Sequence, residues 1–219
     1  MKKSNSLINK FREPVNGLTH FFGAIVSLAG LIYLVVKGWG NSVHVVAYLI
    51  YGLSLTGLFS ASAAYHLVNS NNRVSLILRK LDHTAIYLLI AGSYTPLCLI
   101  FFSGFWQYGL LAIIWALAVV GIVVKLFTIR APRWITAGIY LVMGWLCILA
   151  VREMTATMPS AALIWLIVGG LFYTIGAVIY ITKKMDFFPG HFGFHEVWHV
   201  FVILGAFSHF IVVSFSTTI

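Results

Sequence analysis

The amino-acid sequence predicts an all-α polytopic membrane protein, a bundle of seven transmembrane helices. Of its 219 residues, 61% are hydrophobic and only 9% are charged, whereas roughly 25% are charged in an average soluble domain. Apolar stretches long enough to cross about 30 Å of hydrocarbon recur from Asn16 to Ile219, with only short polar breaks between them. One membrane domain, residues 1–219, therefore accounts for the chain, and these features exclude a soluble protein.

The first apolar stretch follows a polar, basic lead at residues 1–15. This lead is longer than the charged region of a signal peptide, and no small-residue cleavage site follows the stretch, so we interpret the stretch as a retained helix. Gly, Pro, Asn and Ser supply turn residues in the breaks, which fall at 38–42, 69–73, 103–104, 130–133, 157–160 and 186–193. The predicted spans are 16–37, 43–68, 81–102, 106–125, 134–151, 160–182 and 195–217.

The distribution of basic residues predicts the orientation. With the N-terminus in the cytoplasm and the C-terminus outside, all of the 14 Lys and Arg residues except Lys37 and Arg152 fall on the cytoplasmic side. The formal charge of +9 thus follows the positive-inside rule and does not indicate nucleic-acid binding. Cys98 and Cys147 lie inside apolar segments and are expected to be buried thiols.

Ionisable residues near hydrocarbon are costly, and here they gather at one predicted end of the bundle. The second span ends with Ser62 and His66, the third begins with Asp82, and the seventh begins with His195 and His199. The last two are four residues apart, hence about 40° around a helix and about 6 Å along it, so both rings can face one ion. Glu13, Asn16 and His20 enter the first span at the same end.

Three neutral imidazoles with one open position are the arrangement that a catalytic zinc site requires. Asp82 and Ser62 are placed to hydrogen-bond a water or ligand at such a site. Zinc is the default metal for these ligands, although imidazole also suits iron, copper and nickel. Histidines at 195 and 199 are also compatible with simple hydrogen bonds between neighbouring helices.

Other interpretations apply to several of these polar residues. Asp82 can pair with Arg79 or Lys80 in a solvated ion pair, and Ser62 also suits close helix packing. His83 points about 100° away from Asp82 and ranks below the main three histidines. Structural roles are favoured for the remaining histidines, His44, His191 and His209.

The segment from His195 to His199 also matches H-E-x-x-H, the zincin signature in which Glu196 is the general base. An intramembrane metalloprotease is therefore an alternative hypothesis. The pattern has only three fixed positions and arises easily in a chain with 8 histidines. A protease of this type also needs a third metal ligand in a suitable context.

Three motifs in this order resemble the bacterial haemolysin III proteins, members of the progestin and adipoQ receptor family. They are Glu13-Pro14-Val15-Asn16 with Thr19-His20, Ser62-x-x-x-His66 followed by Asp82, and His195-x-x-x-His199. The resemblance covers nearly the whole chain and implies a zinc ion held by His66, His195 and His199, with Asp82 and Ser62 around the reacting water. In that family the residue after the first of the last two histidines is not a fixed Glu, which argues against Glu196 as a base.

The resemblance also implies kinship with adiponectin receptors and alkaline ceramidases. We therefore expect a zinc-dependent lipid amide hydrolase in the bacterial cytoplasmic membrane, with a membrane lipid as substrate or ligand and a role in lipid homeostasis. A non-enzymatic sensor of membrane state, with a closed structural zinc site, is the second hypothesis. A cytolytic protein, as the family name suggests, is the third, although no row of polar residues follows a full transmembrane path.

Overall fold

The computed structural model describes residues 11–188 and 192–218, so His191 lies outside the described residues. Seven described helical segments are long and apolar enough to cross a membrane, which confirms the predicted fold class. Their bounds are Pro14–Lys37 (α1), Ser42–Leu67 (α2), Asn72–Phe101 (α3 with a π-helical end), Gly104–Phe127 (α4), Arg133–Thr157 (α5 and α6), Ser160–Thr182 (α7) and Phe194–Phe215 (α8).

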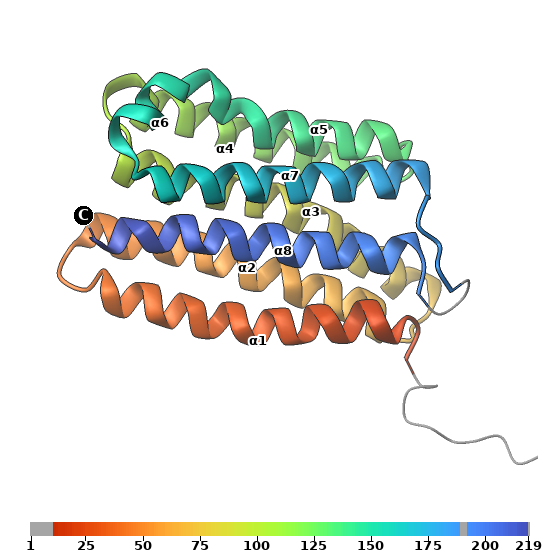
Figure 1. Ribbon diagram of the computed structural model, residues 1–219. Coiled ribbons are helices and arrows are strands. Elements are labelled where there is room, and N and C mark those ends of the chain that lie inside the picture. Colours follow the sequence, from red (N-terminus) through yellow and green to blue (C-terminus); the bar gives the residue numbers. More distant parts are fainter. Residues whose placement is uncertain (1–10, 189–191, 219) are drawn as a thin grey trace, which may run out of the picture.

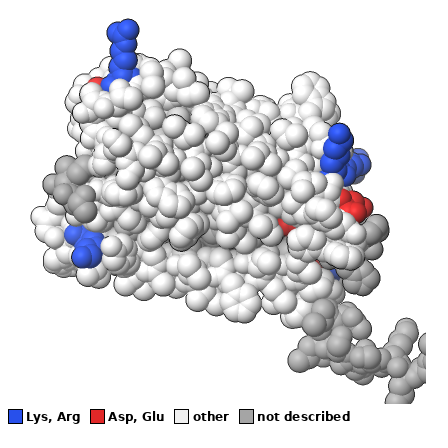
Figure 2. All heavy atoms as spheres, in the orientation of Figure 1, with Lys and Arg blue, Asp and Glu red and all other residues white. Residues whose placement is uncertain are grey.

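The helices lie side by side along one axis, and α8 packs between α1 and α7 (Figure 1). The described N-terminal residues and the C-terminus lie at opposite ends, as an odd number of spans requires. We call the end where α1, α3, α5 and α8 begin the histidine end. Figure 2 shows an uncharged surface along the length of the bundle, with charged side chains gathered toward its two ends. The cytoplasmic placement of the histidine end stays a prediction from the positive-inside rule.

The third helix begins at Asn72, nine residues before the predicted start of its span at 81. Asn71 caps it, because its side-chain oxygen accepts a hydrogen bond from the backbone N–H of Val74 at 3.0 Å. Residues 72–80 are mostly exposed. They include Arg73, Arg79 and Lys80, and these basic residues mark the start of the uncharged stretch in the sequence but not the start of the helix.

The fifth span also continues past its predicted end at 151, to Thr157. The charged pair Arg152 and Glu153 ended the apolar stretch in the sequence but not the helix. Glu153 accepts hydrogen bonds from the backbone N–H and hydroxyl of Ser103, at 2.8 and 2.7 Å. These contacts tie the helix end to the break before α4.

Two irregular helix segments lie next to each other in the half of the bundle away from the histidine end. The chain forms a π-helix at Leu97–Phe101 and a 3₁₀-helix at Leu146–Ala150. The Tyr94 hydroxyl accepts a hydrogen bond from the Cys147 N–H at 2.8 Å and donates to the carbonyls of Gly144 and Met143 at 2.9 and 3.0 Å. The Tyr94 hydroxyl therefore replaces hydrogen-bond partners that these backbone groups lose where the helix is irregular.

Replacing Tyr94 with Phe is expected to lower the free energy of unfolding by about 1–3 kcal/mol, because buried backbone groups lose their partner. Thermal unfolding in detergent measures this loss. Tyr108→Phe is the matched control, since Tyr108 is 65% exposed. Equal melting temperatures for Tyr94→Phe and Tyr108→Phe would show that the backbone finds other partners.

Candidate metal centre

Three histidine rings meet at the histidine end of the bundle. His66 lies in the last turn of α2, and His195 and His199 lie in the first two turns of α8. The ring centroids are 5.2 Å apart for His66 and His195, 4.7 Å for His66 and His199, and 4.8 Å for the α8 pair. One ligand atom from each residue lies within 4.8 Å of the others. The spacing allows one ion to contact all three after small side-chain rotations.

Helix α1 brings a carboxylate to this cluster. The Glu13 carboxylate and His66 Nδ1 are 2.6 Å apart, and the Glu13 backbone N–H donates to the His66 carbonyl at 2.9 Å. The hydrogen bond with His66 lowers the pKa of Glu13 to about 2, so the carboxylate is ionised. Because the proton on Nδ1 of His66 points to Glu13, the lone pair on Nε2 is free to bind a metal ion. A carboxylate behind a ligating histidine is the usual outer partner at metal sites.

If the cluster binds zinc as the sequence predicts, replacing Glu13 with Gln is expected to weaken this binding by about 10–100-fold, because the His66 ring loses its charged partner. Competition with a fluorescent chelator measures the affinity. Glu153→Gln, at the opposite end of the bundle, is the control. An unchanged dissociation constant in Glu13→Gln would contradict a role for this carboxylate in orienting His66.

Asn16 and Glu196 connect α1 to α8. The Asn16 amide donates to Glu196 at 2.8 Å and to Glu13 at 3.2 Å. The Glu196 carboxylate also accepts from the Gly193 backbone N–H at 2.8 Å and so caps α8. These contacts give Glu196 a structural role and weaken the metalloprotease hypothesis, in which the same carboxylate must face a reacting water.

His20 lies beside the cluster without belonging to it. Its ring centroid is 4.0 Å from that of His199, the side chain is 3% exposed, and neither ring nitrogen has a hydrogen-bond partner. His199 Nδ1 is also buried without a partner. Buried polar atoms of this kind are costly unless something pairs with them. They show that the pocket around the histidines has the chemistry to accept a ligand or an ion.

Asp82 and Ser62 lie next to each other at the same end. Ser62 is buried and Asp82 half-buried, and both line the same cavity as His66. No ion pair joins Asp82 to Arg79 or Lys80 among the residues that the structure describes. The structure therefore favours a place near the cluster over the solvated ion pair that the sequence left open.

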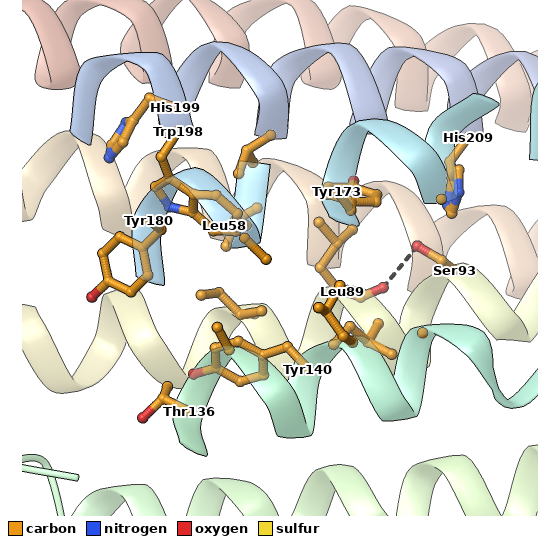
Figure 3. Close-up of a pocket in the computed structure, with 18 of the residues that line it drawn as sticks. Leu58, Leu89, Ser93, Thr136, Tyr140, Tyr173, Tyr180, Trp198, His199 and His209 are labelled. Atoms are coloured by element: carbon orange, nitrogen blue, oxygen red, sulfur yellow. Dashed lines mark hydrogen bonds between the residues drawn. The ribbon is translucent and has the colours of Figure 1, made fainter. Parts of the chain in front are cut away.

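A cavity of about 840 Å³ runs from the cluster into the membrane-spanning part of the bundle. Figure 3 shows His199 at one end and His209 at the other, with Leu58 and Leu89 between them. Mainly apolar side chains line this middle part. The histidine end is polar, and its lining includes Glu13, His20, Ser62, His66, Asp82, His195 and Glu196.

The remaining histidines lie outside the cluster. His44 is near the start of α2, at the opposite end of the bundle. His83 and His209 line the cavity, His83 near Asp82 and His209 far from the three-histidine cluster. Cys98 and Cys147 are free and buried, as predicted.

Fold and site together define a class: a seven-span helical membrane protein with a buried three-histidine cluster that opens onto a long apolar cavity. The family model for haemolysin-III related proteins matches residues 8–210, and the chain belongs to this family. It is a multi-pass bacterial membrane protein.

Two bacterial relatives and one animal relative show how far the similarity extends. The chain is 36% identical to the hemolysin-3 homolog of Bacillus subtilis over 93% of both chains. It is 38% identical to hemolysin-3 of Bacillus cereus, over 93% of this chain and 90% of the relative. The adiponectin receptor protein of Drosophila melanogaster is 27% identical, over 94% of this chain and 50% of the receptor.

Proposed function

We propose that this protein is a zinc-dependent hydrolase that cleaves an acyl amide bond in a membrane lipid. One observation carries the proposal: the three-histidine cluster and the apolar cavity form one continuous space. Metal ligands alone are compatible with a structural ion, and an apolar cavity alone is compatible with a lipid-binding protein. Their combination places a reactive group at the end of a channel for a hydrocarbon chain.

The donor set fits zinc. Among the described residues, the cluster consists of three imidazoles and includes no thiolate or carboxylate. This set is typical of catalytic zinc sites, which leave one position for water or substrate. Glu13 holds the His66 ring through Nδ1, and the one-turn spacing of His195 and His199 directs both rings to the same side of α8. A zinc ion held by these three histidines would supply Lewis acidity, which makes water nucleophilic near neutral pH and polarises a carbonyl.

Asp82 and Ser62 take the roles of proton carrier and hydrogen-bond donor. The Asp82 carboxylate accepts a proton from the attacking water as the new carbon–oxygen bond forms, and returns it to the leaving nitrogen as the amide bond breaks. The Ser62 hydroxyl donates a hydrogen bond to the carbonyl oxygen as negative charge develops on it. The products are a fatty acid and an amine, so one amide and one water are consumed.

The cavity favours a substrate with a long hydrocarbon chain. Its volume lies within the range of about 300–1,000 Å³ found for small-molecule sites. Its middle part offers apolar side chains, and each methylene group buried there contributes about 0.8 kcal/mol. The amide specificity rests on the resemblance to alkaline ceramidases described above.

Incubation of the purified, reconstituted protein with ceramides and other N-acyl lipids tests the proposal. Mass spectrometry is expected to detect equal amounts of free fatty acid and amine. Release stops on treatment with a chelator and returns on addition of zinc. A protein that binds zinc but releases no fatty acid from any lipid mixture would instead have a structural zinc site, as in a membrane-state sensor.

A further inference from the structure

Three basic side chains lie at the histidine end of the bundle, on the side formed by α3, α4 and α5. They are Arg79 of α3, Lys125 of α4 and Arg133 of α5, and we call them the basic site. Both arginines line the cavity. Lys125 is only 4% exposed and donates a hydrogen bond at 2.9 Å to Thr136, which also lines the cavity. Figure 3 shows Thr136 at the same end of the cavity as His199.

A contact between α5 and α3 brings members of the basic site toward one another. The Tyr140 hydroxyl donates to the His83 carbonyl at 3.0 Å, so these faces of the two helices meet. Thr136 and Arg79 precede these two residues by four positions, which is about one helical turn. Because α3 and α5 both begin at the histidine end, Arg79 lies one turn nearer that end, on the same side as Thr136 and its partner Lys125.

Two aromatic rings hold Arg133 near the histidine cluster. Its guanidinium carbon is 5.1 Å from the ring centroids of both Tyr180 and Phe194. The Tyr180 centroid is in turn 5.9 Å from that of His195, so the guanidinium lies within about 11 Å of the His195 ring. A lipid whose reacting group is at the cluster can therefore place its head group at Arg133.

The positive charges of the basic site have no counter-charge in the protein. The chain has only 5 acidic residues, and none of them forms an ion pair with the basic site in the part of the chain that the structure describes. Lys125 has one acceptor for its three ammonium protons, and Nη1 of Arg133 is buried without a partner. Basic residues that only set the topology can stay in water, whereas buried positive charge is costly until an anion pairs with it.

We propose that the basic site binds a phosphate group in the head group of the lipid that occupies the cavity. The inference rests on the proposed function and narrows its substrates to N-acyl lipids that carry a phosphate near the amide. Arginine binds phosphate oxygens through paired hydrogen bonds, and lysine adds a point charge. Basic pockets between membrane helices on the cytoplasmic side, where the histidine end is predicted to lie, are typical sites for phosphorylated head groups.

Binding of two simple lipids to the zinc-loaded protein in a maltoside detergent, which contains no phosphate, tests this inference. The probes are octadecyl phosphate and octadecanol, which differ only in the phosphate. Octadecyl phosphate is expected to bind about 10–100-fold more tightly, the factor that hydrogen bonds to charged groups supply. Equal affinities would overturn the inference.

Inorganic phosphate separates a lipid ligand from a free ion. At the concentration of octadecyl phosphate it is expected to compete only weakly, because it lacks the hydrocarbon chain that the apolar part of the cavity stabilises. Displacement of octadecyl phosphate by an equal concentration of inorganic phosphate would assign the site to the free ion and overturn the lipid head group.

The double variant Arg79→Gln and Arg133→Gln is expected to lose most of the preference for octadecyl phosphate. Arg130→Gln is the matched control, since Arg130 is exposed, lies three residues before Arg133 and does not line the cavity. If the double variant does not fold, Arg79→Gln alone, at an exposed position, is expected to reduce the preference. A preference that persists in the folded double variant would place the phosphate at the zinc and overturn the inference, as would an equal loss in Arg130→Gln.

These outcomes are separate from those of the proposed function. Neither probe contains an amide bond, so their affinities do not depend on hydrolysis. Absence of amide cleavage together with a clear phosphate preference would reject the enzyme and keep the basic site. Cleavage of N-acyl lipids with no phosphate preference would do the reverse.

Discussion

The double variant His66→Ala and His199→Ala is expected to contain almost no zinc after purification, whereas the unmodified protein is expected to contain about one ion per chain. The remaining His195 is a single ligand and cannot hold the ion alone. At a thousandfold excess of zinc over its dissociation constant, the metal stabilises the unmodified protein by about 4 kcal/mol, and this stabilisation is lost in the variant. Elemental analysis and thermal unfolding with and without zinc measure both effects.

His44→Ala controls for the loss of a histidine that lies outside the cluster. Circular dichroism is expected to show that the double variant keeps its helices, because the apolar packing of seven spans does not require the metal. Full zinc content in the double variant would show that the ion binds elsewhere and would remove the basis of the proposed hydrolase.

The second large effect is expected for Asp82→Asn. Lipid amide turnover is expected to fall by about 10²–10⁴-fold, because the attacking water loses its proton acceptor. Asn keeps the size of the side chain, and the zinc content is expected to stay unchanged because Asp82 is not one of the clustered ligands. Mass-spectrometric assay of fatty-acid release measures the change.

Asp186→Asn is the matched control, since Asp186 is an exposed residue in the segment between α7 and α8. Ser62→Ala is expected to lower turnover by a smaller factor, about 10²–10³-fold, through loss of one hydrogen bond to the developing oxyanion. Unaltered turnover in Asp82→Asn would contradict its assignment as the general base and direct attention to Glu13 or His20.

Much of the site was predictable because membrane topology restricts where helix ends can lie. Residues 62–66, 82 and 195–199 fall at the ends of spans that all reach the same side of the bilayer, because consecutive spans alternate in direction. The i,i+4 spacing of His195 and His199 predicted that both rings face one way, and their ring centroids lie 4.8 Å apart. The helix bounds were less predictable at 72–80 and 152–157, because charged residues there limit the uncharged stretch in the sequence but do not end the helix.

The partners of these residues were not predictable in the same way. Nothing in the sequence says that α1 packs against both α2 and α8, yet this packing brings Glu13 to His66 and Asn16 to Glu196. The H-E-x-x-H pattern illustrates the consequence: its glutamate caps a helix and binds an asparagine from 180 residues earlier in the chain. Hydrogen bonds of this range depend on the arrangement of whole helices.

The sequence by itself determined the class of protein, the number of spans and the end of the bundle at which histidines gather, since hydrophobicity and helical periodicity are local properties of the chain. Only the tertiary structure decided which carboxylate orients His66, and that an apolar cavity leads from the predicted three histidines to His209. These features arise from side-chain packing between helices distant in sequence, and hydropathy contains no record of which helices become neighbours.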